Sequence, residues 1–273
     1  MVIYEILTTT SNVYKAFNEI IMRLTISIIF LFLSGMLKGQ TTFLNRPSKT
    51  ESAIVLEKGT FQFESTYETE LTGESDERER EILFPGILLR YGLGWGIELR
   101  FANHYETFKD NFGAVDGFAD IDIGAKMKLL NGNDKKNEVA ITSYLFLPTG
   151  SNDISNERVG NETFVIVWHE LNEKLGIEYN IGYSNFEIDS RKGDFVYSFV
   201  SDYEINDKLG AFIETYGELI EFEELETSVD FGLAYQFNDV LELELATGTG
   251  INHKMFFTLI GLSWRIGEQY DYK

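Results

Sequence analysis

Charged side chains at every second position are the feature of this sequence that could do chemistry. Residues 120–129 read Asp-Ile-Asp-Ile-Gly-Ala-Lys-Met-Lys-Leu, so an extended chain would carry charges on one face and mostly apolar groups on the other. The same alternation recurs along the chain, and the charged residues that it assigns to the polar faces are Glu64, Glu98, Arg100, Asp120, Asp122, Lys126, Lys128, Glu178, Glu214, Asp230, Glu242, Glu244 and Arg265. If these faces surround one cavity, the excess of acids over bases attracts cations and repels anions.

The sequence offers few residues for other kinds of site. It contains no Cys, which excludes a thiolate metal site, a Cys nucleophile and a disulfide scaffold, and its three His include no pair four residues apart. We therefore predict no catalytic residue, no metal and no cofactor. A serine hydrolase is the alternative, because His104 and His253 could meet a Ser or Asn of a loop, such as Ser151 or Asn252.

The composition indicates a large folded β domain that does not bind nucleic acid. Lys and Arg number 23 against 44 Asp and Glu, a net charge of −21, whereas a nucleic-acid binder needs a basic patch. Such acidity is compatible with disorder, but aromatic residues make up 14% of the chain, which is typical of a folded protein. Its 273 residues include 24 Gly and only 3 Pro, which favours a single β domain.

Residues 1–40 are predicted to be a signal peptide. An apolar run covers residues 24–37, with Arg23 before it and small residues near its end. With a rise of about 1.5 Å per residue, this run is too short to span about 30 Å of hydrocarbon. Met22 is the predicted true start, since residues 1–21 lack the pattern of a leader. The alternative is an uncleaved signal-anchor helix.

From Lys58 onward the sequence divides into twelve segments of period-two alternation, separated by turn-like clusters. Most are about 9–11 residues long, which suits a tilted strand that crosses a membrane better than a soluble strand of about 5–6 residues. The predicted strands are Thr60–Leu71, Arg80–Tyr91, Trp95–Tyr105, Asp120–Leu130, Glu138–Leu147, Glu162–Glu170, Leu175–Phe186, Asp194–Glu204, Leu209–Glu218, Leu225–Phe237, Leu241–Gly248 and Lys254–Ile266.

The connections between these strands distinguish a membrane barrel from a soluble sandwich, which shows the same alternation. Each odd-numbered connection is longer than the even-numbered one after it, as when long external loops alternate with short periplasmic turns. We therefore predict an all-β fold: a single antiparallel transmembrane β-barrel of about 12 strands over residues 58–267, in the outer membrane of a Gram-negative bacterium. Residues 41–57 form an N-terminal periplasmic segment and residues 268–273 a C-terminal tail. The even strand number places both termini in the periplasm.

Residues 46–52 and 55–64 carry a family resemblance. They read Arg-Pro-Ser-Lys-Thr-Glu-Ser and Val-Leu-Glu-Lys-Gly-Thr-Phe-Gln-Phe-Glu, which fits Arg-Pro-x-x-Thr-Glu followed by Lys-Gly and a strand with Gln-x-Glu. This stretch resembles the opening of a family named for a MetA pathway of phenol degradation, whose members are usually called transporters and are represented as outer-membrane barrels. Similar stretches at 91–93 with 98–100, at 117–126 and at 147–150 extend the likeness along the mature chain. The resemblance implies a barrel transporter, and the family name is not carried over as phenol chemistry.

Arg46, Pro47, Thr50 and Glu51 form the family motif of the N-terminal segment. Pro47 fixes its own φ and biases Arg46 toward extended backbone. We interpret the motif as a structural lid at the periplasmic mouth, with Arg46 paired to a carboxylate of the lumen, rather than as a substrate site.

Together these observations predict an outer-membrane barrel, not an enzyme, that gives small solutes passive and selective passage, aromatic or hydrophobic ones among them. Twelve strands lie between filled barrels of about 8 and open pores of about 16–18, so a narrow or partly occluded pore is expected. Its charges either select cations or pair across strands as a polar plug. The alternatives are a lipid-modifying enzyme and a structural or adhesive barrel with an occluded lumen. Expected partners are outer-membrane lipids, the barrel-assembly machinery and small-molecule solutes; the oligomeric state is left open.

Overall fold

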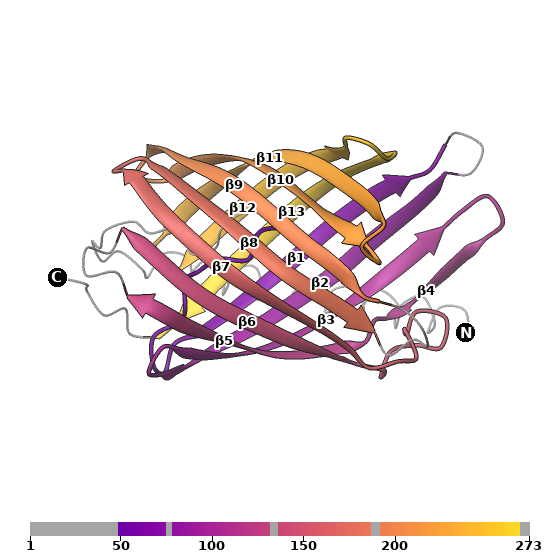
Figure 1. Ribbon diagram of the computed structural model, residues 1–273, viewed down its shortest axis with the longest axis horizontal. Helices are drawn as coiled ribbons and strands as arrows, with labels where there is room; N and C mark the ends of the chain where they lie inside the picture. The colour runs from indigo at the N-terminus through magenta and orange to yellow at the C-terminus, as the bar shows by residue number, and fades with distance from the viewer. Residues whose placement is uncertain (1–48, 75–77, 132–135, 187–191, 268–273) are drawn as a thin grey trace, which may run out of the picture. The chain divides into compact units, whose positions relative to one another are not determined.

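The computed structural model describes residues 49–74, 78–131, 136–186 and 192–267, and these fold into β-strands without helices (Figure 1). The strands are β1 (Phe61–Thr72), β2 (Glu79–Gly94), β3 (Ile97–Lys109), β4 (Ala114–Phe118), β5 (Ile121–Asn131), β6 (Asn137–Leu147), β7 (Gly160–Asn172), β8 (Leu175–Phe186), β9 (Asp194–Asn206), β10 (Leu209–Ile220), β11 (Glu224–Asn238), β12 (Leu241–Gly250) and β13 (Met255–Ile266). Each predicted strand overlaps one of these. The predicted signal peptide and C-terminal tail lie outside the described residues.

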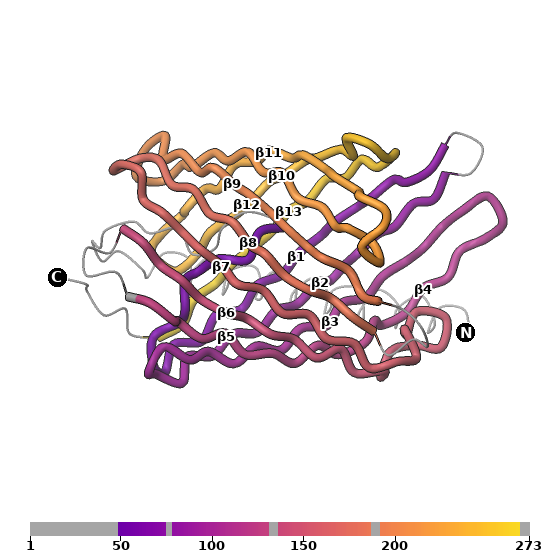
Figure 2. The backbone as a smooth tube through the Cα atoms, viewed as in Figure 1, coloured from indigo at the N-terminus to yellow at the C-terminus, as the bar shows by residue number. Residues whose placement is uncertain are grey.

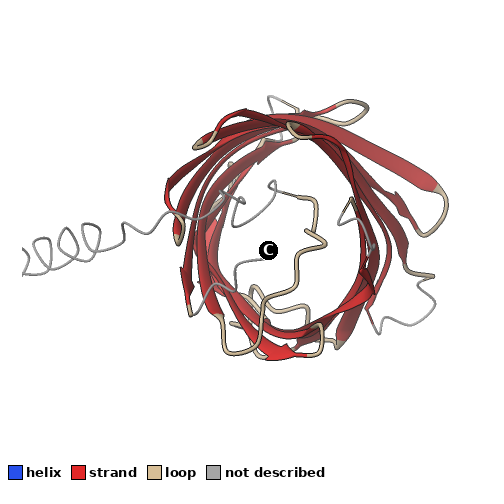
Figure 3. Cartoon of the chain, turned by 90° about the vertical axis from the view of Figure 1, so that its left-hand side faces the viewer, coloured by secondary structure: helices blue, strands red, loops and turns tan. Residues whose placement is uncertain are grey.

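Twelve of these strands close into a barrel. Neighbours pair antiparallel from β5 round to β13, and the ring closes because β13 pairs with β1, β1 with β2, β2 with β3, and β3 with β5. Figure 2 traces the tilted strands, and Figure 3 looks along the ring that they form. Closure gives every strand a partner on both sides, which a membrane demands because hydrocarbon offers the backbone no hydrogen bonds. The predicted single antiparallel barrel is confirmed.

β4 is an additional strand that the sequence analysis missed. Residues 106–119 are predicted to be a loop, but β3 continues to Lys109 and β4 returns along it. β4 and β5 lie end to end beside β3, with a break at Ala119 and Asp120. The prediction is wrong here because four of the five residues of β4 are exposed, so the strand needs no alternation of apolar and polar side chains.

The lengths of the connections alternate from one end of the barrel to the other. β1 begins and β13 ends at the same end, where Phe61 faces Ile266. The two-residue connections at that end are 95–96, 173–174, 207–208 and 239–240. Longer connections such as 148–159 lie at the other end. Which end faces the periplasm stays a prediction.

Burial in the barrel strands is the reverse of burial in a soluble protein. In β3, Glu98 is 0% exposed and the adjacent Leu99 is 47% exposed. In β10, Glu214 is 1% exposed and the adjacent Ile213 is 58% exposed. Polar side chains therefore line the lumen, while apolar side chains cover the outer wall and face lipid. This arrangement concentrates the charged side chains inside the barrel.

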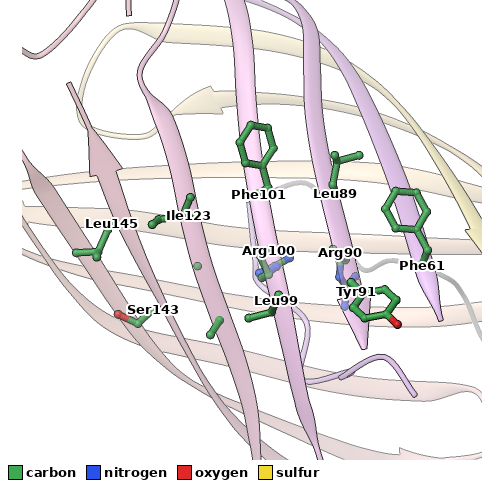
Figure 4. A pocket seen from close by; sticks show the side chains of 12 residues that line it. Phe61, Leu89, Arg90, Tyr91, Leu99, Arg100, Phe101, Ile123, Ser143 and Leu145 are labelled. Carbon is green, nitrogen blue, oxygen red and sulfur yellow. The ribbon is translucent and has the colours of Figure 1, made fainter. Parts of the chain in front are cut away.

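The outer wall has a shallow hollow of about 580 Å³ over strands β1, β2, β3, β5 and β6 (Figure 4). Outward-facing side chains such as Leu99, Phe101 and Ile123 line it, and the small residues Ala125 and Ser143 leave it open. Because its lining is mostly apolar, we assign this hollow to the surface that lipid tails cover.

Candidate functional site

A short segment of the chain runs through the inside of the barrel before β1 begins. We call residues 49–56 the luminal strap, and Figure 3 shows loop inside the ring of strands. Its hydrogen bonds reach β1, β2, β3, β5, β6, β8 and β10. Most of the predicted periplasmic segment that the structure describes thus lies in the lumen. Where that segment begins stays a prediction.

A tight turn at residues 57–60 leads the chain from the strap into β1. Gly59 has a φ of 79°, in the left-handed region that favours glycine, and the N–H of Thr60 donates to the carbonyl of Glu57 at 3.0 Å. Gly92 of β2 packs against this turn, and a Cβ at Gly92 would lie 1.9 Å from the carbonyl oxygen of Glu57. The chain can therefore enter the lumen so close to β2 only because residue 92 is a glycine.

Glu51 is the centre of a cluster of basic groups from the barrel wall. Its Oε2 accepts hydrogen bonds from Arg100 Nη1 at 2.6 Å and Lys126 Nζ at 3.0 Å. Its Oε1 accepts one from the hydroxyl of Tyr144 at 2.7 Å, and the Arg100 guanidinium lies over the Tyr144 ring, 5.2 Å from its centroid. Lys126 also donates to the carbonyl of Ser52 at 2.5 Å. Charge-assisted hydrogen bonds of this kind fix both position and orientation.

The same contacts keep the strap carboxylate ionised. Burial alone would raise the pKa of Glu51, but the charges of Arg100 and Lys126, with the hydrogen bonds from Arg100 and Tyr144, hold that pKa well below its usual range. The strap therefore brings a permanent negative charge to this side of the lumen at neutral pH.

Arg90 of β2 joins the strap to two carboxylates of the wall. It forms a bidentate ion pair with Glu98, with Nε–Oε1 at 2.7 Å and Nη2–Oε2 at 2.9 Å, and its Nη1 lies 3.0 Å from Glu64 Oε1. Its Nη2 also donates to the carbonyl of Ile54 at 3.1 Å. The N–H of Leu56 donates to Glu98 Oε2 at 2.9 Å. The Arg90 guanidinium thus connects the backbone of the strap to the carboxylates of the barrel wall.

The other side of the lumen presents carboxylates to the strap. Thr50 Oγ1 donates to Glu214 Oε1 of β10 at 2.6 Å, and the N–H of Ala53 donates to Glu178 Oε1 of β8 at 2.6 Å. Lys49 Nζ forms an ion pair with Glu68 of β1 at 2.6 Å. The strap therefore offers this side one ammonium group and otherwise neutral donors.

Most of the charged residues predicted to line the lumen are buried. These are Glu64, Glu98, Arg100, Asp120, Lys126, Glu178, Glu214, Asp230, Glu242 and Glu244. Asp122, Lys128 and Arg265 are partly exposed. Lys128 Nζ lies 3.0 Å from Glu138 Oε1, and Arg265 Nε donates to Gln62 Oε1 at 2.9 Å. The structure thus places these groups, but their contact with a solute stays a prediction.

Asp120 has a different position from the rest of that set. Its carboxylate accepts hydrogen bonds from the backbone N–H groups of Thr149, Gly150 and Asn156 at 2.9–3.0 Å and from the Ser155 hydroxyl at 2.7 Å. Burial opposes ionisation, but these hydrogen bonds lower the pKa of the carboxyl. Asp120 therefore holds the β6–β7 loop against the break between β4 and β5, away from the cluster at Glu51.

Arg90 and Tyr144 are luminal residues that the sequence pattern did not reveal. Arg90 stands in the run Leu-Leu-Arg-Tyr at residues 88–91, where the apolar Leu88 shares a strand face with Arg90 and breaks the alternation. Tyr144 falls on the inward face of β6, but an aromatic ring is not counted as polar in such a pattern. Of the predicted motif, Thr50 and Glu51 contact the wall as described above. Arg46 and Pro47 lie outside the described residues, so the Arg46 ion pair stays a prediction.

His104, one of the histidines proposed for a hydrolase, has an acidic partner. Its Nε2 lies 3.1 Å from Glu106 Oε2. Ser151, the serine considered for it, accepts a hydrogen bond on Oγ from the N–H of Phe118 at 3.0 Å. This serine is therefore engaged in holding the loop beside β4.

The described part of the chain shows neither a metal cluster nor a spanning helix. Within it, no group of three or more His, Cys, Asp or Glu side chains is arranged to hold a metal ion. Over the same ranges, no helix is long and apolar enough to cross a membrane.

The closed ring, the charged interior and the apolar outer wall define a transmembrane β-barrel of the Gram-negative outer membrane. More particularly, the chain belongs to the family described as "Putative MetA-pathway of phenol degradation", which matches residues 44–266. The resemblance noted in the sequence is thus confirmed.

Solved structures share this fold at low sequence identity. The COG4313 outer membrane channel from Pseudomonas putida F1 is 13% identical, with a TM-score of 0.69 over 81% of this chain and 100% of that chain. The KdgM porin in complex with disordered oligogalacturonate is 9% identical, with a TM-score of 0.51 over 76% of this chain and 99% of that chain. A comparison with curated proteins found no match.

Proposed function

We propose that this barrel gives small solutes passive passage across the outer membrane, through a lumen that the luminal strap narrows. The observation that carries the proposal is the strap itself, which is held inside the barrel by hydrogen bonds to seven strands. A barrel of about 8 strands is filled by its own side chains, whereas one of twelve encloses more space. A segment tied across that space sets the width of a route. The description of similar folds as a channel and a porin supports this proposal.

The charges of the lumen favour neutral and cationic solutes, aromatic ones included. Glu51 offsets Arg100 and Lys126 on one side, and carboxylates such as Glu178 and Glu214 are in excess on the other. In a narrow lumen of low dielectric constant, such an excess repels anions.

Conductance of the refolded mature chain in a planar bilayer, under a KCl gradient, tests the proposal. We expect small, discrete, cation-selective steps. Glu51→Gln removes the negative charge that is paired with Arg100 and Lys126, so the strap should leave the lumen part of the time. The mean conductance of Glu51→Gln should then rise at least about twofold above the wild-type value.

Glu57→Gln is the matched control, because it makes the same change of charge at an exposed position outside the strap. Its conductance should equal that of the wild type. If the folded wild-type barrel and Glu51→Gln are both electrically silent, and neither admits neutral solutes into liposomes, the proposal of a passage is wrong.

We also propose that the chain is not a lipid hydrolase. His253 Nε2 lies 3.4 Å from Ser228 Oγ, and His253 Nδ1 lies 3.3 Å from Asn252 Oδ1. A hydrolase with a Ser-His-Asn triad would use the same sequence of contacts. However, Ser228 is buried on the luminal face of β11, so a lipid ester at the outer wall does not reach it. The folded protein should release no fatty acid from phospholipid vesicles, and Ser228→Ala should leave that baseline unchanged.

A further inference from the structure

Glu244 of β12 is a buried carboxylate on the acidic side of the lumen. The residue is 7% exposed, and its Oε1 accepts no hydrogen bond from any residue that the structure describes. Leaving a buried polar acceptor without a donor is unfavourable, so such a group points to something that occupies the space beside it.

That space is a small pocket of about 50 Å³ between β1, β12 and β13. Glu244 faces Gly261 across the β12–β13 pair, and Gly261 faces Thr66 of β1. Because Gly261 has no side chain, the wall recedes there, and the nearest atom to an added Cβ would be 3.5 Å away. A water molecule takes about 30 Å³ in the liquid, so the pocket has room for one small polar group.

The chemical character of the pocket is acidic. Glu64 and Glu242 line it together with Glu244, and the hydroxyl of Ser263 adds a neutral oxygen. Two bases of the wall lie near these acids: Arg90 forms an ion pair with Glu64 at 3.0 Å, and Arg265, two residues beyond Ser263 on β13, donates to Gln62. A cation in the pocket would meet several oxygen acceptors at once, and an anion would be repelled.

We infer that this pocket binds a monovalent cation, either the protonated amine of a permeating solute or a small monovalent metal ion. The inference deepens the proposed function and rests on it, because the pocket lies on the wall of the proposed route. An ammonium group has three donors, which the Glu244 carboxylate and the hydroxyls of Ser263 and Thr66 can accept. A divalent ion fits less well, since no three acids in the described chain are arranged as metal ligands.

Thermal unfolding of the detergent-folded chain tests the site without relying on conductance. Methylammonium chloride is added in place of choline chloride at constant ionic strength, because the trimethylated head of choline is too large for the pocket. We expect a saturating rise of about 2 °C or more in the unfolding midpoint, since a ligand that binds only the folded state stabilises it. Potassium chloride in a parallel series distinguishes a metal ion from an amine: a rise with both assigns a general monovalent site, and a rise with methylammonium alone assigns an amine site.

Two variants and one control make the result specific. Glu244→Gln removes the charge, and Gly261→Ala fills the pocket without changing any charge, so both should abolish the rise. Gly261→Ala keeps the test valid if Glu244→Gln folds poorly, because an added Cβ there makes only ordinary contacts. Glu138→Gln is the control, since it removes one acid on the other side of the barrel and should keep the full rise.

Either of two results would overturn the inference. One is a wild-type midpoint that does not respond to methylammonium or potassium, which would mean that Glu244 is a neutral structural group. The other is a rise in both Gly261→Ala and Glu244→Gln that equals the rise of the wild type. Both are separate from a failure of the proposed passage, which shows itself as a silent barrel in the bilayer regardless of the unfolding midpoint.

Discussion

The two sides of the lumen hold their charges in different ways. On β2, β3 and β5, the cations Arg90, Arg100 and Lys126 are buried, and each lies within 3.0 Å of a carboxylate oxygen. On β8, β10 and β12 the buried charges are carboxylates. There the strap gives Glu178 and Glu214 neutral donors.

This difference fits the proposed function, in which one side of the lumen is structural and the other, here called the functional side, faces the solute. A buried ion pair adds little net stability, but breaking it leaves a charge without compensation, so the basic side should resist change. The acidic side carries repulsion that the folded protein tolerates, which is more typical of a surface that awaits a ligand. The charges of the strap match this difference, because the Glu51 carboxylate contacts the basic side and the Lys49 ammonium group faces the acidic side.

The most damaging change should be the loss of a cation from the structural side. Arg90→Ala leaves Glu98 and Glu64 buried without their guanidinium, so we expect the free energy of unfolding to fall by about 3–5 kcal/mol. Urea unfolding of the barrel in lipid vesicles, followed by Trp fluorescence, measures this loss. Arg80→Ala, which removes an exposed guanidinium, should change stability by less than about 0.5 kcal/mol. Similar losses in both variants would contradict the structural role of the basic side.

A second change compares two glycines of the lumen wall. Gly92→Ala places a methyl group 1.9 Å from the carbonyl of Glu57, whereas Gly261→Ala places one no closer than 3.5 Å to any atom. We expect Gly92→Ala to lower the free energy of unfolding by about 1–3 kcal/mol and to raise conductance, because the root of the strap must shift. Gly261→Ala should do neither. Equal conductance in Gly92→Ala and the wild type would show that the strap does not limit flow.

The sequence predicts the walls of this molecule better than what lies between them. Alternation along each strand identifies the inward charges, because a membrane barrel allows only polar groups inside and apolar groups outside. It therefore assigns Glu98, Lys126 and Glu214 to the lumen without any knowledge of the partners that they meet. β4 escapes the same pattern because four of its five residues are exposed.

The strap could not be predicted in the same way. Nothing local in residues 49–56 shows that Glu51 meets Arg100 and Lys126, since those contacts join parts of the chain about 50 and 75 residues away. The family-like motif marks the segment as unusual but does not give its place, and the sequence alone suggested a lid. Arg90 was missed because the apolar Leu88 shares its strand face and breaks the alternation.

The third prediction concerns the pH range over which Glu51 holds the strap. Its pKa in the folded protein is well below that of an unfolded glutamate, about 4.3. A carboxyl of depressed pKa contributes stability above the unfolded value, and that contribution is lost as the pH falls through the folded value. The difference in unfolding free energy between the wild type and Glu51→Gln should therefore be constant from pH 7 to 5 and shrink only below about pH 4. Urea unfolding of both proteins across this pH range measures the difference in unfolding free energy. If that difference has already halved at pH 5.5, Arg100 and Lys126 do not stabilise the ionised form of Glu51.

The smallest effect is expected on the functional side. In choline chloride, where the pocket has no cation to bind, Glu244→Gln should be as stable as the wild type or more stable by up to about 1 kcal/mol, because it removes repulsion from Glu242 and Glu64. This is the opposite sign to Arg90→Ala. Addition of methylammonium should then raise the stability of the wild type above that of the variant. If Glu244→Gln is instead destabilised in choline as strongly as Arg90→Ala, Glu244 is part of the structural framework. The two sides of the lumen would then differ only in the sign of their charges, and the charged residues of both sides would stabilise the barrel.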